Sequence, residues 1–242
     1  MYSFDIEIAG YVIHVETIHT RPKAICRDFI VTNKPADIDI RITEADIDID
    51  RKEYEASFDI LDPWEGFLEV STLCRLVTTK FIEFDTIMLH GAAVAYNQQS
   101  YIFSAPSGTG KTTHAIKWLR NLPGTFMVNG DKPFIKFLQE GNVLVCGSPW
   151  AGKETIYTNT MVPLKAIIFM ERAEENRIEQ ISFLQAFSFL LQQVYHPEDA
   201  DKMRKTLHLM QRLQETVNFY RFRCNNFKDN CFDVAYHALV EG

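Results

Sequence analysis

One stretch of this chain has residue types and spacing suited to phosphate binding: Ser107-Gly108-Thr109-Gly110-Lys111-Thr112-Thr113. An apolar run precedes it and a helical pattern follows it. Strand, glycine-rich loop and helix in this order are typical of a phosphate-binding loop of the Walker A type. Gly108 and Gly110 can take backbone angles that point successive N–H groups into one concavity. The helix that begins near Lys111 adds its positive dipole end. The stretch therefore predicts a nucleotide site.

The individual roles follow from the chemistry of phosphate. We expect the Lys111 ammonium to reach the β- and γ-phosphates and the Thr112 hydroxyl to reach Mg²⁺. ATP, or another nucleotide, with Mg²⁺ is therefore the expected cofactor. Ala105 stands where such loops usually have their first glycine. The alternative is a glycine-rich turn ahead of a helix that binds nothing. The nucleotide-binding residues that we predict are Ser107, Gly108, Thr109, Gly110, Lys111, Thr112 and Thr113.

A nucleotide loop also needs an acidic partner, for Mg²⁺ or for the attacking group. Asp131 lies just past the hydrophobic stretch 125–128, so we expect it at the mouth of the sheet beside the γ-phosphate. It is the candidate base or metal ligand, and the alternative is a turn aspartate ahead of Lys132-Pro133. His90 begins a strand expected beside the loop strand. It is a candidate catalytic residue or, alternatively, a buried structural histidine.

The segment 147–154 combines a constrained backbone with reactive side chains. Glycine and proline fix its path, and Trp150, Lys153 and Glu154 offer stacking, charge and acid. Loops of this kind frequently carry function, so Lys153 is a further catalytic candidate. Solvated charges on an ordinary loop are the alternative. Arg172 and Arg177 are candidates for contact with phosphate.

The apolar patterns predict the elements that position these residues. An amphipathic helix is expected over 73–84, a buried strand over 88–96, and strands over 125–128, 134–138, 143–146, 164–170 and 219–222. Helices are expected over 111–122, 183–195 and 198–215. Ser182 and Gln185 form a capping-box pattern at the start of one of them. Together these predict an α/β nucleotide-binding domain over residues 71–242.

Residues 1–70 are predicted to be a β-rich N-terminal portion. Phe4, Ile6 and Ile8 alternate with polar residues, and Ala9-Gly10 can turn the chain. Two later stretches, 38–42 and 47–49, alternate isoleucine with aspartate or arginine. The aspartates lack the glycine and the bidentate glutamate of a calcium loop. We therefore expect the solvated face of an edge strand.

Composition limits the class of protein. The 242 residues carry a net charge of −7, and no long basic run occurs, which argues against nucleic acid or an anionic membrane as the main partner. The five cysteines show no metal-binding or redox spacing, which favours reduced thiols in a cytoplasmic protein. No stretch is apolar for long enough to predict a membrane span. A homo-oligomer is left open.

Several segments together resemble known families. The stretch 107–113 is similar to the loop of ATP-dependent phosphoenolpyruvate carboxykinases. The motifs 89–91 (Leu-His-Gly) and 128–131 (Val-Asn-Gly-Asp) flank that loop as in the catalytic domain of HPr kinase/phosphorylase. With 130–133, 147–154 and 169–173, the chain resembles small bacterial HPr-kinase-related proteins over about residues 64–240.

The resemblance implies a mixed twisted sheet of the carboxykinase type and phosphoryl transfer to a hydroxyl, commonly serine. The roles it implies are those of a base for Asp131 and of an assisting histidine for His90. Gly130 stands where that family has a first aspartate, and the family's C-terminal signature for phosphorolysis is absent. We therefore predict an ATP–Mg²⁺-dependent kinase whose acceptor is a serine of a peptide or protein, or a small alcohol. The alternatives are a nucleotide-dependent switch or slow ATPase that acts through a protein partner, and a non-enzymatic nucleotide-binding module.

Overall fold

The structure is a computed structural model that describes residues 1–58 and 64–241. The chain divides into two compact units, Met1–Phe81 and Ile82–Gly242. The predicted division at residue 70 lies inside a helix of the first unit, α3 (Glu65–Phe81). The mixed α/β class that the sequence predicts is confirmed, with a mixed sheet in each unit.

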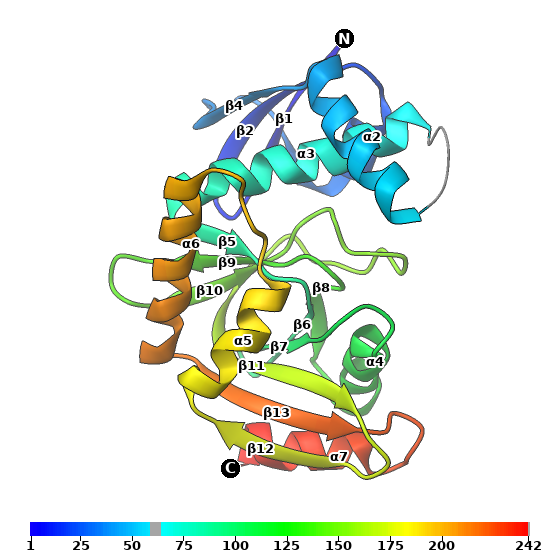
Figure 1. The fold of residues 1–242 in the computed structure, drawn as a ribbon, viewed down its shortest axis with the longest axis vertical. Helices are drawn as coiled ribbons and strands as arrows, with labels where there is room; N and C mark the ends of the chain where they lie inside the picture. Colours follow the sequence, from blue (N-terminus) through cyan, green and yellow to red (C-terminus); the bar gives the residue numbers. More distant parts are fainter. Residues whose placement is uncertain (59–63, 242) are drawn as a thin grey trace. The chain divides into compact units, whose positions relative to one another are not determined.

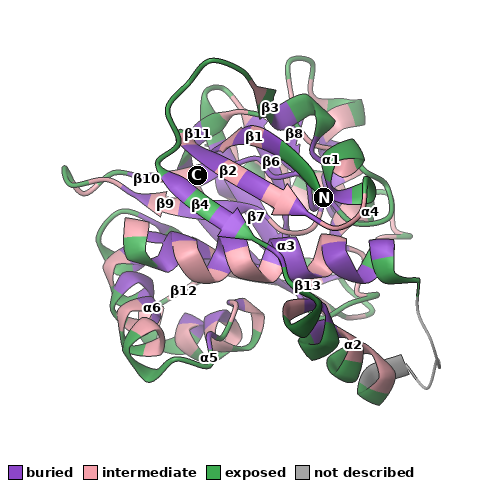
Figure 2. Ribbon diagram, turned by 90° about the horizontal axis from the view of Figure 1, so that it is seen from above, coloured by how far each residue is buried: buried purple, intermediate pink, exposed green. Residues whose placement is uncertain are grey.

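The first unit contains a four-stranded sheet in the order β3-β1-β2-β4. Its strands are β1 (Tyr2–Ile8), β2 (Tyr11–Thr17), β3 (Ile30–Val31) and β4 (Ile38–Arg41). β1 and β2 form the predicted hairpin, in which Ala9 and Gly10 take φ values of 54° and 75° at the turn. The alternating residues Phe4, Ile6 and Ile8 are buried. Figure 2 shows buried stretches, in purple, along β1 and β2.

This unit is not all-β, which corrects the prediction for residues 1–70. Its helices are α1 (Arg21–Ile25), the 3₁₀ turn η1 (Arg27–Phe29), α2 (Glu44–Phe58) and α3. The stretch 47–49 therefore lies in a helix and not in an edge strand. Thr43 and Asp46 hydrogen bond to each other at the helix start, as in a capping box. The Asp50 carboxylate accepts hydrogen bonds from the Thr72 hydroxyl and the Arg75 guanidinium of α3. These tertiary contacts stabilise the helical conformation of α2.

The second unit is built on a nine-stranded sheet that runs β5-β9-β10-β11-β7-β6-β8, with β13 also paired to β11, and β12 to β13. The strands are β5 (Thr86–Met88), β6 (Ala92–Tyr96), β7 (Gln99–Ser104), β8 (Phe126–Asn129), β9 (Phe134–Phe137), β10 (Val143–Cys146), β11 (Met161–Arg172), β12 (Arg177–Ile181) and β13 (Asn218–Cys224). β7, β11 and β13 are parallel, so their carboxyl ends meet at one edge of the sheet.

Helices cover both faces of this sheet, as Figure 1 shows. α5 (Phe183–Gln193) and α6 (Ala200–Arg212) pack on one face, and α4 (Lys111–Asn121) and α7 (Cys231–Tyr236) on the other. The remaining helical turns are η2 (Ile82–Phe84), η3 (Leu213–Glu215) and η4 (His237–Glu241). Ser182 and Gln185 form the predicted capping box at the start of α5.

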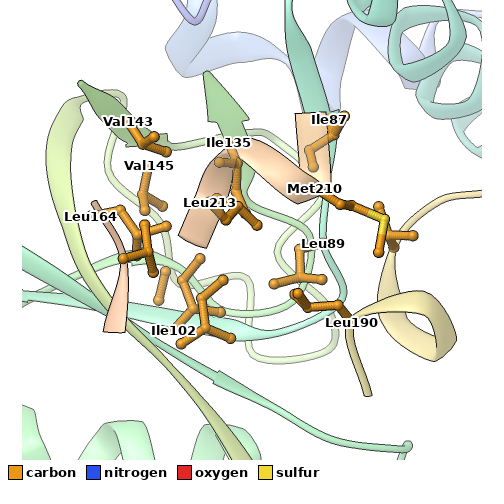
Figure 3. Packing of buried hydrophobic residues seen from close by; sticks show 14 of the residues in the cluster. Ile87, Leu89, Ile102, Ile135, Val143, Val145, Leu164, Leu190, Met210 and Leu213 are labelled. Carbon is orange, nitrogen blue, oxygen red and sulfur yellow. The ribbon is translucent and has the colours of Figure 1, made fainter. Parts of the chain in front are cut away.

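Alternation along β7 divides the core between these two faces. Ile102 points to the cluster beneath α5 and α6, which Figure 3 shows with Leu89, Ile135 and Leu190. Its neighbours Tyr101 and Phe103 point to the cluster beneath α4 and α7. β7 is therefore buried on both faces, which fixes the position of the loop that follows it.

Two details of the second unit differ from the predicted elements. The strand predicted over 88–96 is interrupted at residues 89–91, so that β5 and β6 pair with different neighbours. His90 lies in this break. β12 was not predicted, because its alternation is weak and its residues are exposed or half-buried.

Candidate functional site

The glycine-rich loop, residues 105–110, connects the buried strand β7 to the start of α4. Gly108 and Gly110 have φ values of 77° and 106°, which side-chain-bearing residues rarely adopt. Gly110 is the N-cap residue of α4, and its carbonyl accepts from His114 N at 2.9 Å. The loop therefore presents its backbone beside the positive end of a helix dipole.

Lys111 is buried at the base of this loop, with 6 % of its surface exposed. Its Nζ donates to the carbonyl oxygens of Ala105 at 2.9 Å and Pro106 at 3.4 Å. Burial lowers the pKa of the ammonium, and the nearby Asp131 carboxylate opposes that shift. These contacts hold the positive charge of Lys111 beside the loop, where it can attract a bound anion.

Asp131 follows β8 on a turn that a buried side chain, Asn129, holds in place. Asn129 Oδ1 accepts from the backbone N–H groups of Asp131 at 2.8 Å and Lys132 at 2.7 Å. Asn129 Nδ2 donates to both the carbonyl and the hydroxyl oxygen of Ser148, each at 2.9 Å. The Ser148 hydroxyl in turn donates to Lys132 O at 2.7 Å. The position of the carboxylate is therefore set by a closed hydrogen-bond network.

His90 lies beside Asp131 because β8 pairs antiparallel with β6 and β6 pairs antiparallel with β7. His90 Nε2 is 3.2 Å from Asp131 Oδ1, and Nδ1 is 3.1 Å from Gln193 Oε1. Its backbone is held as well, since its N–H donates to Gln193 O at 2.8 Å and its carbonyl accepts from Ser104 Oγ at 2.7 Å. The imidazole is thus fixed between α5 and the Asp131 turn.

The Asp131 carboxyl has a pKa below its ordinary value. Burial, the largest single influence, raises this pKa, but the hydrogen bond and charge of His90 and the charges of Lys132 and Lys111 outweigh it. The group is therefore an ionised carboxylate at neutral pH, which can accept a proton or bind a cation.

The segment 147–158 packs against the end of β8. Thr158 N donates to Val128 O at 3.2 Å, and Trp150 is buried with its ring 6.2 Å from that of Phe134. Gly152, at φ 77°, lies against Asp131, so that an added Cβ would be 3.0 Å from the aspartate Cβ. Trp150 is therefore a core residue, and the exposed Lys153 and Glu154 are the parts of this segment that face outward.

Gly130 has no room for a side chain. A Cβ at this position would lie 2.8 Å from Ala151 O and 3.3 Å from Ile156 O. The backbone of the segment 147–158 occupies the space that an acidic side chain would need.

One cavity of about 460 Å³, here named the His90 cavity, gathers most of the predicted site residues. Its lining comes from four places in the sequence that the sheet brings together. The residues are His90, Ser107, Gly108, Gly110, Lys111, Thr112, Thr113, Gly130, Asp131, Gly152, Lys153 and Glu154. The loop, the candidate base and the candidate lysines thus share one concave site.

A second cavity of about 670 Å³, the Phe227 cavity, lies along the same loop and shares Gly108, Gly110 and Thr113 with the first. It contains the predicted residue Thr109, together with Arg172, Ala173, Cys224, Asn225, Asn226 and Phe227. It forms where the carboxyl ends of β7, β11 and β13 meet. Arg172 donates to Gly108 O, whereas Arg177 pairs with Glu179 at 3.6 Å and does not line either cavity.

The donors beside the loop suit Mg²⁺ bound with a nucleotide. Thr112 Oγ1 lies 3.5 Å from Gly130 O, and the ionised Asp131 lines the same cavity. Across the described ranges 1–58 and 64–241, no cluster of three or more His, Cys, Asp or Glu side chains could hold a metal ion. Mg²⁺ commonly takes one or two protein ligands and completes its shell with phosphate oxygens and water, so this sparse set fits it.

Sequence reasoning missed four residues that position the site: Asn129, Ser148, Gln193 and Asn226. The first had a usable signal, because asparagine two residues before an aspartate in a turn often accepts from the following backbone N–H groups. Asn226 donates from Nδ2 to Gly110 O at 3.1 Å. Ser148, Gln193 and Asn226 act across long sequence separations, for which no local pattern exists.

Comparisons with known proteins show a distant likeness in structure but none in sequence. No protein-family model matches the chain, and no curated protein matches it in sequence. Among solved structures it is similar to the Hpr(Ser) kinase/phosphatase from Coxiella burnetii, at 10 % identity and a TM-score of 0.37, over 64 % of this chain and 97 % of that one. Among the helices of the described residues, none combines the length and apolar character of a membrane span.

Proposed function

We propose that this chain is an ATP–Mg²⁺-dependent kinase that transfers a phosphoryl group to a hydroxyl, a serine of a peptide or protein or a small alcohol. The observation that carries the proposal is the His90 cavity. It joins a glycine-rich loop and its lysine to an ionised aspartate that is hydrogen bonded to a histidine. Phosphoryl transfer depends mainly on positioning and on electrostatic stabilisation, and this set of groups supplies both.

Each group in the cavity has a role in this proposal. The loop N–H groups and Lys111 bind the phosphates, with Ser107, Thr109 and Thr113 beside them. Thr112 and Asp131 are the protein ligands for Mg²⁺, which when bound neutralises charge on the phosphates. Asp131 also accepts the proton of the acceptor hydroxyl, and His90 holds its carboxylate in place. Lys153, which lines the open side, contacts the transferred group or the acceptor.

The different linings of the two cavities indicate the orientation in which a nucleotide would bind along the loop. Lys111 and Asp131 line only the His90 cavity, so the β- and γ-phosphates belong there. The Phe227 cavity continues from the same glycines without these groups, and we place the nucleoside in it. The fully exposed ring of Phe227 and the guanidinium of Arg172 offer planar surfaces for a base.

A second candidate function is a nucleotide-dependent switch or slow ATPase that acts through a protein partner. The observation that favours it is the attachment of the loop to distant elements. Arg172, the last residue of β11, donates to the carbonyl of Gly108, and Asn226, which follows β13, donates to the carbonyl of Gly110. A change in the conformation of the loop on nucleotide binding would therefore alter these hydrogen bonds and the segments that carry Arg172 and Asn226.

The deciding experiment incubates the protein with γ-labelled ATP, Mg²⁺ and cell extract, and identifies the labelled product by mass spectrometry. A labelled serine or small alcohol supports the kinase. Label that appears only as inorganic phosphate, at a rate stimulated by an extract protein, supports the switch. Asp131→Asn is the matched control, and transfer that is equal in the wild type and this variant would contradict the proposed kinase mechanism.

A further inference from the structure

Another cavity, of about 190 Å³, lies between the sheet and α5 beside the glycine-rich loop, and the proposed function makes no use of it. We name it the Phe189 cavity. Its lining comes from the carboxyl ends of β7 and β11, the start of the loop and the last turn of α5. It includes Ser104, Pro106, Phe169, Phe189, Gln192 and Gln193.

The fold brings these residues together from three elements. β7 and β11 are parallel, and their register places Phe169 beside Ser104. On α5, Phe189 is three and four residues from Gln192 and Gln193, so the three share one side of the helix. The rings of Phe169 and Phe189 are stacked, with centroids 5.2 Å apart and planes inclined by 23°. Two aromatic rings therefore form one wall of the cavity.

The polar side chains of the lining are held by partners within the protein. Ser104 Oγ donates to His90 O at 2.7 Å, and Gln193 Oε1 is 3.1 Å from His90 Nδ1. The carboxylate of Glu171, which also lines the cavity, accepts from Arg221 Nε at 2.9 Å and from Arg221 Nη2 at 3.1 Å. The surface that remains for a ligand is therefore mainly apolar.

The size and the position of the cavity suit one apolar side chain. An apolar cavity of about 150 Å³ can hold a benzene molecule, so a volume of about 190 Å³ is enough for leucine, methionine or phenylalanine. The cavity is also open to solvent, because Gln192 and Pro106 are exposed and Phe189 is half-buried. A side chain can therefore enter it from outside.

The Phe189 cavity adjoins the His90 cavity on two sides. Gln193 contacts both the imidazole and the backbone N–H of His90. Pro106 lies on the other side, where its carbonyl accepts from Lys111 Nζ at 3.4 Å. One residue of an extended chain spans about 3.3–3.6 Å. A peptide with its serine beside Asp131 can therefore place a neighbouring side chain in the Phe189 cavity.

We propose that the Phe189 cavity is an acceptor-specificity site, which binds one apolar side chain within two residues of the phosphorylated serine of a peptide or protein. The transfer step rests on the proposed function, whereas binding of the apolar side chain does not. The inference selects a peptide or protein as the acceptor, because a small alcohol in the His90 cavity would leave the adjoining apolar cavity without a role.

The first test detects binding of the side chain and needs no catalysis. Alanine peptides with a single serine carry photo-leucine at one of the two positions on either side of that serine. The full chain is irradiated with each peptide, with and without ATP–Mg²⁺, and the adducts are mapped by mass spectrometry. We expect adducts within residues 104–106, 169–171 or 189–193 for at least one peptide. An excess of the same peptide with leucine should suppress them, and the alanine peptide should not.

Gln192→Trp places a large ring at the mouth of the cavity from an exposed position on α5, so the fold should be retained. We expect this variant to lose the adducts. Gln211→Trp, the same substitution at an exposed position on α6, should keep them. Adducts only at other segments, no adducts at all, or equal labelling of the wild type and Gln192→Trp would overturn the proposal.

The second test measures kcat/KM for transfer from γ-labelled ATP to peptides that differ only by leucine or alanine at the position that gave adducts. A single methylene in a hydrophobic pocket changes kcat/KM by about 10- to 200-fold, so we expect leucine to be preferred by at least about 10-fold. The preference should appear mainly in KM, because the side chain is bound both before and during transfer. Gln192→Trp should abolish this preference.

A calorimetric titration with ATP–Mg²⁺ separates this proposal from the proposed function. Transfer to serine with equal kcat/KM for the leucine and alanine peptides would refute the acceptor-specificity site and leave the kinase standing. Mapped adducts in a chain that does not bind ATP, or that binds it and labels no peptide, would refute the kinase. Binding of an apolar side chain in the Phe189 cavity would then still stand.

Discussion

The imidazole Nε2 of His90 lies 3.2 Å from the carboxylate Oδ1 of Asp131. Both residues line the His90 cavity together with the glycine-rich loop. Neither residue belongs to a strand. His90 interrupts the path from β5 to β6, and Asp131 follows β8, so the pair depends on the order of strands in the sheet. The predictions below test whether this pair and the loop act as one site.

Replacing Asp131 with asparagine separates its two proposed roles. The change keeps the shape of the side chain but removes the charge and the capacity to accept a proton. As a general base contributes about 10²- to 10⁴-fold, transfer should fall by that factor while nucleotide affinity persists. If the residue acts chiefly as a ligand of Mg²⁺, affinity should fall too and recover in part at higher Mg²⁺. Transfer rates and ATP affinity, measured at several Mg²⁺ concentrations, distinguish the two roles. Transfer by the variant at close to the wild-type rate would show that Asp131 has neither role.

The lowered pKa of Asp131 predicts a pH dependence of stability. A carboxyl with a lower pKa in the folded than in the unfolded chain stabilises the fold above the unfolded value, and this contribution is lost as pH falls through the folded value. The stability difference between wild type and Asp131→Asn should therefore be constant above about pH 5 and shrink in more acidic solution. Denaturant titrations across that range test it, with Asp201→Asn on the exposed surface of α6 as the control for loss of one charge. A difference that grows on acidification would contradict the shift.

Asn129→Ala should damage both the fold and the site. The variant leaves the backbone N–H groups of Asp131 and Lys132 and the Ser148 oxygens without their partner, which should cost about 1–3 kcal/mol of unfolding free energy. Transfer should fall as well, since the carboxylate loses its anchor. Asn121→Ala, at an exposed position on α4, should change stability by no more than about 0.5 kcal/mol. Chemical denaturation and a transfer assay on both variants test this, and equal effects would show that Asn129 positions nothing.

Lys111→Ala tests the loop itself. The variant loses a buried positive charge aimed at the proposed phosphate site, whereas the loop N–H groups and the helix dipole remain. ATP affinity should weaken and turnover should fall by at least about 100-fold. Lys52→Ala, an exposed position on α2, controls for loss of a lysine. Unchanged affinity and turnover in a folded Lys111→Ala protein would refute the nucleotide site.

Lys153→Ala distinguishes a working residue from a solvated charge on the segment 147–158. Lys153 is exposed and lines the His90 cavity. We expect reduced transfer with a change in stability of no more than about 0.5 kcal/mol. Melting curves and transfer rates, measured side by side, test this. If the Lys153→Ala variant transfers at the wild-type rate, Lys153 takes no part in the reaction.

The sequence alone determined the features that depend on neighbouring residues. The spacing of Gly108, Gly110 and Lys111 after an apolar run predicted the strand, the loop and α4, because backbone freedom and helix initiation act within a few residues. Hydrophobic periodicity likewise identified α5 and its capping box, as well as the buried strands. It failed at residues 47–49, where alternation suggested a strand. The contacts of Asp50 with Arg75 and Thr72 stabilise a helix there.

Tertiary structure decided the relations between distant residues. Sheet order brought His90 to Asp131, and Asn129 and Ser148 joined two loops whose sequences carry no sign of each other. It also excluded a side chain at Gly130, since the backbone of the segment 147–158 fills that space. Such pairings arise from the order of strands and the close packing of loops, which are properties of the whole chain and not of any local pattern.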